Sequence, residues 1–427
     1  MMRIMRAKDW DWAQLKNPGI QAGNQLEAAV DQIIAQVREQ GDQALYGYAR
    51  QFDGAQLTSL QVEPEAIEAA WAAAQPDFRQ LLTQAADNIR RFHSRQLRQG
   101  FIQEENGKVL GQRVIPLRRV GLYVPGGTAS YPSSVLMNAI PPILAGVEQV
   151  VMATPPGKDG QVAPAILCAA RAAGVKTIFK MGGAQAIAAL AYGTQSVPAV
   201  DKIVGPGNAY VATAKRRVFG VVDIDMVAGP SEILVVADQA ADPVCLAADL
   251  LSQAEHDKLS SAVLITDSRQ LALAVQAQVE KQLEALPRRE IARASVEQNG
   301  KIILVENLEE AVTLANHFAP EHLELCVEDP FALLGGVRNA GSVFLGRNAP
   351  EALGDYWAGL NHTLPTSGTA RFSSPLSVDD FVKTSQFVYY TRDALSQAAK
   401  QIQAFARQEG LEGHARSIGA RFGEVEG

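Results

Sequence analysis

Between residues 109 and 345 the chain alternates short apolar runs with longer amphipathic segments. The short runs predict strands, and the longer segments, whose apolar residues recur every three or four positions, predict helices. After the predicted strands Val114–Leu117 and Val120–Val124, a first block contains strands at Gln149–Ala153, Lys176–Phe179, Asp201–Val204 and Val222–Asp225, with helices at Ser134–Ala145, Ala163–Ala173, Ala184–Tyr192 and Ala209–Val218. A second block contains strands at Ile233–Ala237, Ala262–Thr266, Ile302–Val305, Leu323–Val327 and Ser342–Leu345, with helices at Ala241–His256, Ser268–Leu286 and Leu308–His317. Such alternation is typical of βαβ units, in which helices join parallel strands and cover both faces of the sheet.

The pattern predicts an α/β protein with two doubly wound, Rossmann-like domains, a small N-terminal arm and a helical C-terminal appendage. Residues 1–22 show little periodicity and form the predicted arm. Residues 123–231 form the predicted second domain, which is inserted into a discontinuous first domain made of residues 23–122 and 232–370. Residues 371–427 carry an apolar helical stripe but no predicted sheet, so we expect this appendage to be buried against a partner subunit.

Composition narrows the function classes. Apolar residues make up 47% of the 427 positions, which suffices for large cores. The net charge of −7, from 39 basic and 46 acidic residues, argues against nucleic-acid and anionic-membrane partners. Three widely separated cysteines form no CxxC motif, which fits a reducing compartment. The N-terminus lacks the apolar core of a signal peptide, and no apolar run reaches the ~18 residues of a membrane span, so we expect a cytoplasmic protein.

The segment Leu250–Asp257 is a candidate metal site at the end of a predicted helix. Gln253 and His256 stand three residues apart, so their side chains should project from one side of the last turn. A carboxamide oxygen and an imidazole nitrogen that converge in this way can bind a metal ion. The alternative is an ordinary polar helix end with a solvated histidine.

Three glycine-containing loops follow predicted strands: Tyr123–Gly127, Gly182–Gln185 and Gly205–Asn208. Ligands of doubly wound sheets bind beyond the carboxyl ends of the strands, and glycine lets the backbone approach a phosphate at a helix N-terminus. None of the loops is the dinucleotide motif GxGxxG. In the best candidate Gly205 and Gly207 are correctly spaced, but Tyr210 stands where the third small residue should be. The alternative is that these glycines only permit tight turns.

Further polar loops supply groups for acid–base chemistry or metal binding. Ser231 lies in a turn, and Glu321 and His322 adjoin at a predicted strand entry, where a bend after Pro320 could direct both into one pocket. Four of the six histidines stand in loops that contain glycine, aspartate or glutamate, namely His256, His322, His362 and His414. Together with a carboxylate and a carboxamide, such imidazoles favour a divalent metal site, most simply zinc.

Taken together and in this order, these motifs resemble the histidinol dehydrogenase family. The resemblance rests on Tyr123–Gly127, Gly182–Gln185, Gly205–Asn208, Ala228–Glu232, Leu250–His256, Phe318–Leu323 and Asp355–His362, and extends from about residue 25 to the C-terminus. It implies a zinc-dependent homodimer that oxidises L-histidinol to L-histidine through L-histidinaldehyde, with two NAD consumed, at the end of histidine biosynthesis.

The resemblance also implies residue roles. One Zn²⁺ per subunit would be held by Gln253, His256, Asp355 and His414. Glu321 and His322 would be the acid–base pair, while NAD would contact Tyr123, Gln185 and Asn208. The substrate would contact Ser231, Glu409, His322 and the metal ligands, with Glu409 and His414 supplied across the dimer interface.

Two rival functions remain open from the residues alone. A zinc hydrolase would use a similar ligand set, with Glu321 as general base, but would have no need of glycine loops for a dinucleotide. A nucleotide-binding module without catalysis would leave the Glu321–His322 pair unexplained. A covalent thiol route is disfavoured, because all three cysteines lie in apolar runs.

Overall fold

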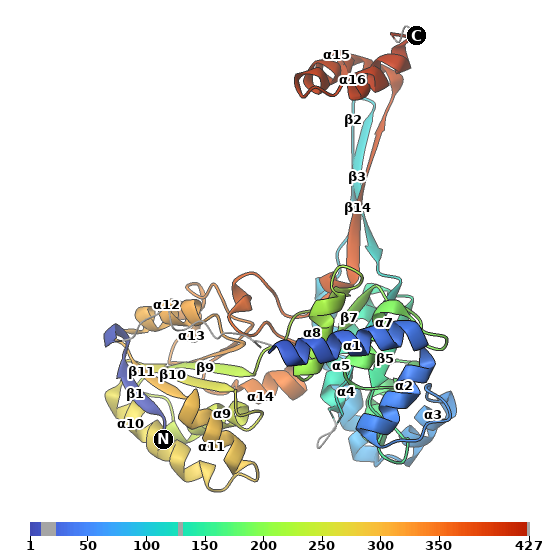
Figure 1. The fold of residues 1–427 in the computed structure, drawn as a ribbon. Helices are drawn as coiled ribbons and strands as arrows, with labels where there is room; N and C mark the ends of the chain where they lie inside the picture. The colour runs from blue at the N-terminus through green and yellow to red at the C-terminus, as the bar shows by residue number, and fades with distance from the viewer. Residues whose placement is uncertain (10–22, 127–130, 425–427) are drawn as a thin grey trace. The chain divides into compact units, whose positions relative to one another are not determined.

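The computed structural model describes residues 1–9, 23–126 and 131–424. The chain divides into two compact units. The first unit comprises Met1–Gln96 and Leu117–Phe381 and contains two parallel sheets (Figure 1). The second unit comprises Leu97–Pro116 and Val382–Gly427 and contains a small antiparallel sheet.

A five-stranded parallel sheet in the first unit has the order β6-β5-β4-β7-β8. Its strands are β4 (Arg119–Tyr123), β5 (Gln149–Thr154), β6 (Thr177–Lys180), β7 (Lys202–Val204) and β8 (Asp223–Ile224), and its helices are α5 (Pro132–Ala145), α6 (Pro164–Ala173), α7 (Gly183–Tyr192) and α8 (Ala209–Val218). The chain moves outward from β4 to β6 and then returns to the other side of β4. This reversal creates a switch point between β4 and β7, where doubly wound sheets bind ligands.

A six-stranded parallel sheet has the order β1-β11-β10-β9-β12-β13. Its strands are β1 (Arg3–Arg6), β9 (Glu232–Ala237), β10 (Ser261–Thr266), β11 (Lys301–Leu304), β12 (His322–Cys326) and β13 (Ser342–Leu345), and its helices are α9 (Pro243–Ala254), α10 (Arg269–Leu283), α11 (Arg289–Gln298), α12 (Leu308–Phe318) and α13 (Pro330–Leu334). Alternate residues of β9 enter two different cores: Val235 packs with residues of α9, α10 and α11, while Val236 packs with residues of α12. Helices therefore cover both faces, and the predicted α/β class with two doubly wound layers is confirmed.

Strand pairing corrects the expected membership of several segments. Residues 3–6, expected in the arm, form the edge strand β1 and pair with β11. Residues 10–22 of the predicted arm lie outside the described residues. Strand β4, expected to end the first domain, pairs with β5 and β7 in the other sheet.

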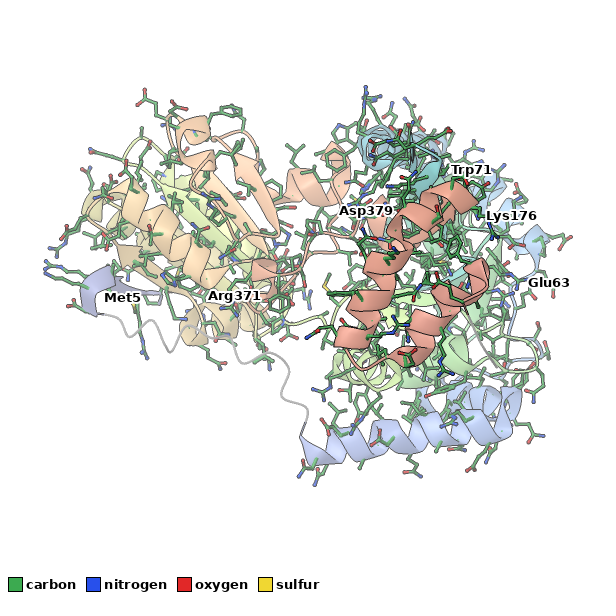
Figure 2. The ribbon with its side chains drawn as sticks, turned by 90° about the horizontal axis from the view of Figure 1, so that it is seen from above. Met5, Glu63, Trp71, Lys176, Arg371 and Asp379 are labelled. Carbon is green, nitrogen blue, oxygen red and sulfur yellow. The ribbon has the colours of Figure 1, made fainter. Side chains whose placement is uncertain are left out.

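The N-terminal helices also belong with the five-stranded sheet. They are α1 (Asn24–Gln40), α2 (Asp42–Tyr48), α3 (Pro64–Ala73) and α4 (Pro76–His93). Val30 and Leu45 share one core with Phe179 of β6, and the Val62 N–H donates to the carbonyl oxygen of Ile178 at 2.9 Å. Figure 2 labels Trp71 of α3, and the Arg171 guanidinium of α6 lies 5.8 Å from the centre of its ring. Because sequence periodicity does not say which sheet a helix covers, the expected grouping of residues 23–122 with 232–370 differs from the observed packing.

The second unit is less helical than the predicted appendage. A three-stranded antiparallel sheet has the order β14-β3-β2, with strands β2 (Phe101–Glu105), β3 (Lys108–Pro116) and β14 (Val382–Tyr390). The helices α15 (Arg392–Gln408) and α16 (Glu412–Gly419) follow β14. Residues 371–427 thus contain a nine-residue strand that the sequence did not reveal. Among the helices that the structure describes, none combines the length and apolar character needed to cross a membrane.

Candidate active site

Most of the predicted catalytic and metal-binding residues gather at the amino edge of the six-stranded sheet. Ser231 directly precedes β9, and His322 is the first residue of β12. Gln253 lies in the last turn of α9, which joins the parallel strands β9 and β10 and so returns to their amino ends. These residues therefore lie at the opposite edge from the carboxyl ends, where ligands of doubly wound sheets usually bind.

Glu321 and His322 both contact the backbone of Glu232. Glu321 Oε2 accepts a hydrogen bond from the Glu232 N–H at 2.9 Å, and His322 Nδ1 lies 3.0 Å from the Glu232 carbonyl oxygen. The chain has a left-handed φ of 49° at Ala319, just before this pair. The two side chains lie close together, with Glu321 Oε2 3.6 Å from His322 Nδ1, and a pocket that they share stays a prediction.

The contact with Glu232 determines the tautomer of His322. A carbonyl oxygen only accepts hydrogen bonds, so Nδ1 must carry the hydrogen. The lone pair then resides on Nε2, which is buried and has no hydrogen-bond partner among the described residues. Nε2 lies 4.0 Å from Glu351 Oε1. His322 therefore presents an unprotonated nitrogen that can accept a proton or bind a metal ion.

His322, Glu351 and Asp355 form a group that could hold a metal ion. One ligand atom from each lies within 4.8 Å of the others. Glu351 begins the short helix α14 (Glu351–Leu353), and Asp355 lies on the following helical turn η5 (Gly354–Ala358). Glu351 was not predicted from the sequence, although its spacing of four residues from Asp355 on a helical segment places both carboxylates on one face.

Gln253 is buried, whereas His256 is exposed. Helix α9 ends at Ala254, two residues before the predicted end, so His256 lies in the turn beyond it and is exposed. The Gln253 side chain lies beside Glu351 and is 1% exposed, and neither its Oε1 nor its Nε2 has a hydrogen-bond partner among the described residues. A buried carboxamide without partners is costly, so its oxygen is available to an incoming cation. His256 Nδ1 lies 3.4 Å from Ser231 Oγ.

Burial disfavours charge throughout this group. It raises the pKa of Asp355 to about 6, raises the pKa of Glu351, and raises that of Glu321 well above its ordinary value. Burial also lowers the pKa of His322, and that of His362 to about 4. A divalent cation would offset this cost, because its charge favours the carboxylate form of the acids and it binds the neutral nitrogen of an imidazole.

His362, which the sequence left without a role, lies at the edge of this group. Its Nδ1 is 3.8 Å from Asp355 Oδ1, and its Nε2 is 3.3 Å from Ser134 Oγ of α5. Its neighbours hold it in place: the Asn361 side chain donates to the Met137 carbonyl oxygen at 2.8 Å. The imidazole therefore faces the carboxylates on a rigid support.

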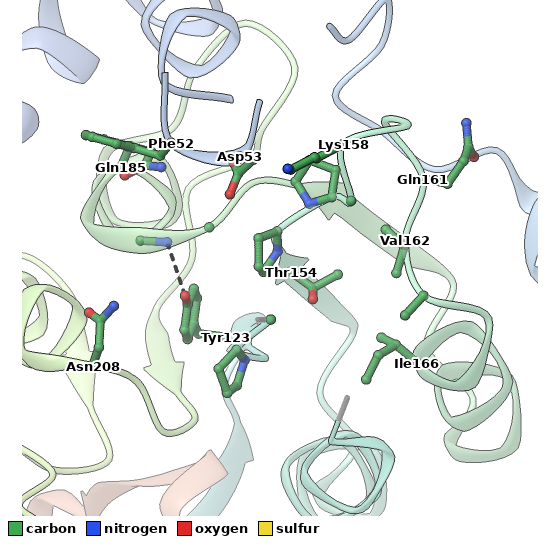
Figure 3. Close-up of a pocket in the computed structure, with 18 of the residues that line it drawn as sticks. Phe52, Asp53, Tyr123, Thr154, Lys158, Gln161, Val162, Ile166, Gln185 and Asn208 are labelled. Carbon is green, nitrogen blue, oxygen red and sulfur yellow. Dashed lines mark hydrogen bonds between the residues drawn. The ribbon is translucent and has the colours of Figure 1, made fainter. Parts of the chain in front are cut away.

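A separate open cleft of about 1170 Å³ lies at the carboxyl ends of β4, β5 and β6. Tyr123, Gln185 and Asn208 all line it, together with Asp53 and Lys158 (Figure 3). The Gly183 N–H donates to the Tyr123 hydroxyl at 3.1 Å, which joins two of the glycine loops. The three predicted loops therefore meet in one cleft that is large enough for a dinucleotide. Gly127, at the end of the first loop, lies outside the described residues.

Asp53 is a lining residue that the sequence analysis did not identify. It ends the helical turn η3 (Ala49–Asp53), and its buried Oδ2 has no hydrogen-bond partner among the described residues. Burial raises its pKa from 3.8 to about 6. Between these two values the folded chain holds a proton that the unfolded chain has lost, so this group lowers stability as the pH rises through the window.

Asp53→Asn should remove that pH dependence. At pH ~3 and below the variant and the natural chain should unfold at similar temperatures, because the carboxyl is then largely neutral in both states. Above pH ~6 the variant should be the more stable, because no charge is buried. Thermal unfolding across this pH range measures the difference, and a difference that does not change with pH would contradict the expectation.

Glu409 and His414 belong to the second unit. Glu409 follows α15, His414 lies on α16, and both side chains are exposed. Their predicted roles at an active site stay predictions.

Comparison with known proteins gives the family. The profile of the histidinol dehydrogenase family matches residues 17–422. The histidinol dehydrogenase of Halalkalibacterium halodurans is 58% identical over 395 residues, which cover 92% of this chain and 93% of that protein. The histidinol dehydrogenase of Bacillus subtilis is 56% identical over 404 residues, or 94% of this chain and 95% of that protein. The crystal structure of histidinol dehydrogenase from Elizabethkingia anophelis superposes with a TM-score of 0.93 at 38% identity and covers 99% of this chain and 98% of that one. The chain belongs to the histidinol dehydrogenase family.

Proposed function

We propose that the chain oxidises L-histidinol to L-histidine through L-histidinaldehyde, with NAD as the electron acceptor in both steps. One observation carries the proposal: the Glu321–His322 pair adjoins a buried group of carboxylates suited to a cation. Family membership supports the same activity. The predicted cytoplasmic location and the homodimer belong to the same proposal.

A zinc ion fits the donors on this chain. The buried, partnerless carboxamide of Gln253 and the carboxylate of Asp355 are oxygen donors, and the exposed imidazole of His256 adds a nitrogen. We assign these three residues and His414 of a second copy as ligands. When bound, zinc would act as a Lewis acid and a template for the imidazole and amine of the substrate. Glu351 lies close enough to be a fifth donor or to hold Gln253 and Asp355 in place.

In the first oxidation His322 acts as the base. Its Nε2 carries the free lone pair and takes the hydroxyl proton of the alcohol as the substrate loses hydride to NAD. The hydrogen bond from Nδ1 to the Glu232 carbonyl oxygen fixes the ring plane and stabilises the imidazolium that forms. Ser231, whose Oγ lies 3.4 Å from His256 Nδ1, would contact the substrate.

In the second oxidation water must add to the aldehyde. Glu321 is the residue assigned to take the water proton, and its Oε2 is held by the Glu232 N–H. Its raised pKa means that Glu321 holds a proton strongly until a nearby positive charge lowers the pKa. Glu321 and His322 thus serve different steps from one backbone support.

The cleft lined by Tyr123, Gln185 and Asn208 is the proposed NAD site. It also separates the proposal from its closest rival, a zinc hydrolase with Glu321 as general base. A hydrolase could use the same carboxylates and histidines, but it would have no use for a cleft of about 1170 Å³ at the helix N-termini of a doubly wound sheet.

The test is to mix the zinc-loaded protein with NAD and L-histidinol and to follow NADH by its near-ultraviolet absorbance. We expect NADH to form, and to stop forming when a chelator removes the metal. A protein with verified metal and intact fold that forms no NADH would contradict the proposal.

Residues of two subunits should complete each site. We propose that His414 and Glu409, both exposed in the second unit, act at the site of a partner subunit. His414→Ala and His256→Ala proteins should each be inactive. After subunit exchange, a mixed dimer should contain one site with both lesions and one with neither, so activity should return to about half of the natural value per mixed dimer.

Exchange itself is followed with differently tagged chains. If mixed dimers form and no activity returns, His414 acts within its own subunit or has no role. A mixture of His256→Ala with Gln253→Ala protein is the matched control, because both lesions lie in the same unit and no intact site can arise.

A further inference from the structure

Lys215 and Asp225 form a buried ion pair next to the proposed NAD cleft. Lys215 lies on α8 and Asp225 follows β8, and their side chains are 2% and 1% exposed. Such a pair adds little net stability, because desolvation offsets the attraction, and apolar replacements of similar volume are often neutral. Its use at this position therefore calls for a reason other than stability.

Both members of the pair hold Gly205. Lys215 Nζ donates to the Gly205 carbonyl oxygen at 3.0 Å, and the Gly205 N–H donates to Asp225 Oδ2 at 2.8 Å. The second carboxylate oxygen of Asp225 also accepts the Met226 N–H at 2.6 Å. The peptide groups on both sides of Gly205 are thus fixed by one ion pair.

Gly205 in turn lies against Tyr123. Its φ of 115° is open to glycine and strained for other residues. A Cβ at this position would collide with the backbone carbonyl oxygen of Tyr123. The Gly205–Asn208 loop therefore packs directly on the end of β4, at the switch point between β4 and β7.

The far end of the same loop is also ordered. Asn208 Oδ1 accepts the N–H groups of Tyr210 and Val211 at 3.0 and 3.2 Å and so caps α8. The helix that carries Lys215 is therefore joined to the loop at two points, at Asn208 and at Gly205. A change at Lys215 should be felt at Gly205 and, through α8, at Asn208, which lines the cleft.

We propose that Lys215 and Asp225 are positioning residues for the dinucleotide, which hold the Gly205–Asn208 loop against Tyr123 in the shape that binds NAD. The pair itself touches no ligand. The inference rests on the proposed function, because it assigns the cleft to NAD. It predicts that loss of the pair weakens dinucleotide binding and leaves the metal group at the other sheet unchanged.

The test is equilibrium binding of NAD, by titration calorimetry, to the full-length zinc-loaded protein. Lys215→Met combined with Asp225→Leu removes the pair and leaves no unpaired buried charge. We expect about tenfold weaker NAD binding, equivalent to ~1.4 kcal/mol. Zinc content and the KM for histidinol should stay as in the natural chain, while the KM for NAD rises. If this double variant does not fold, NAD affinity is measured on Lys215→Met combined with Asp225→Asn. Asn keeps an acceptor for the Gly205 N–H.

Lys202→Met is the matched control. Lys202 is also a buried lysine of the five-stranded sheet and pairs with Asp223 at 2.9 Å and Asp380 at 3.4 Å; it begins β7, whose other end leads to Gly205. It should lower the unfolding temperature without a change in NAD affinity. A folded double variant that binds NAD as well as the natural chain, or a control that loses as much affinity, would overturn the inference. If the natural chain itself binds no NAD, the proposed function has failed first.

Discussion

His256→Ala should lose metal and turnover together. Among the three ligands proposed from one chain, His256 supplies the nitrogen donor. It lies in the turn after α9, where its Nδ1 is 3.4 Å from Ser231 Oγ. Changes to outer-shell partners of a metal typically weaken its binding ~10- to 100-fold, and the loss of a direct ligand should exceed that. The Glu321–His322 pair should stay folded, because the hydrogen bonds that hold it run to Glu232.

The measurement is zinc content by elemental analysis alongside the rate of NADH formation. His317→Ala is the matched control, because His317 also lies at the end of a helix, α12, and is exposed. It should keep both metal and activity. Full turnover in a His256→Ala protein shown to be free of metal would mean that catalysis does not require the metal.

Glu321→Gln should impair the oxidation of the aldehyde far more than that of the alcohol. Only the second step needs water to be activated, and a general base of this kind typically contributes ~100- to 10,000-fold. Glutamine keeps a carbonyl oxygen that can accept the Glu232 N–H, so the local backbone should not change. The variant therefore removes proton transfer by residue 321 without changing the local structure.

The two half-reactions are compared by supplying either L-histidinol or L-histidinaldehyde. Glu328→Gln, an exposed glutamate beyond the other end of β12, provides the control and should change neither rate. Equal losses in both half-reactions would mean that Glu321 supports His322 and does not activate water.

The sheets and their helices were the most predictable part of the chain. Strand β13 and helix α8 have the residue bounds that the apolar pattern predicted. Strands buried on both faces, such as β9, appear as continuous apolar runs, and the intervening helices keep their own period. Two strands were missed. Strand β1 is only four residues long, and β14 is almost entirely exposed, so it lacks the continuous buried apolar run of a central strand.

The site was predictable in its residue types but not in its arrangement. Adjacent Glu321 and His322 stood out in the sequence, yet the backbone of Glu232 that holds both comes from β9, about 90 residues earlier in the chain. Glu351 joins the group through a helix too short to show periodicity. Such long-range contacts depend on which strands pair, and a single sequence does not contain that information in local patterns.

One site should carry out both oxidations, and the measurement that decides this is the ratio of NADH formed to L-histidinol consumed. With limiting histidinol and excess NAD, we expect two NADH for each histidinol, L-histidine as the product and no free aldehyde. The ratio follows from the chemistry, since an alcohol loses two electrons to reach the aldehyde and two more to reach the acid. A ratio of one with histidinaldehyde released, or histidinol consumed without NADH, would contradict it.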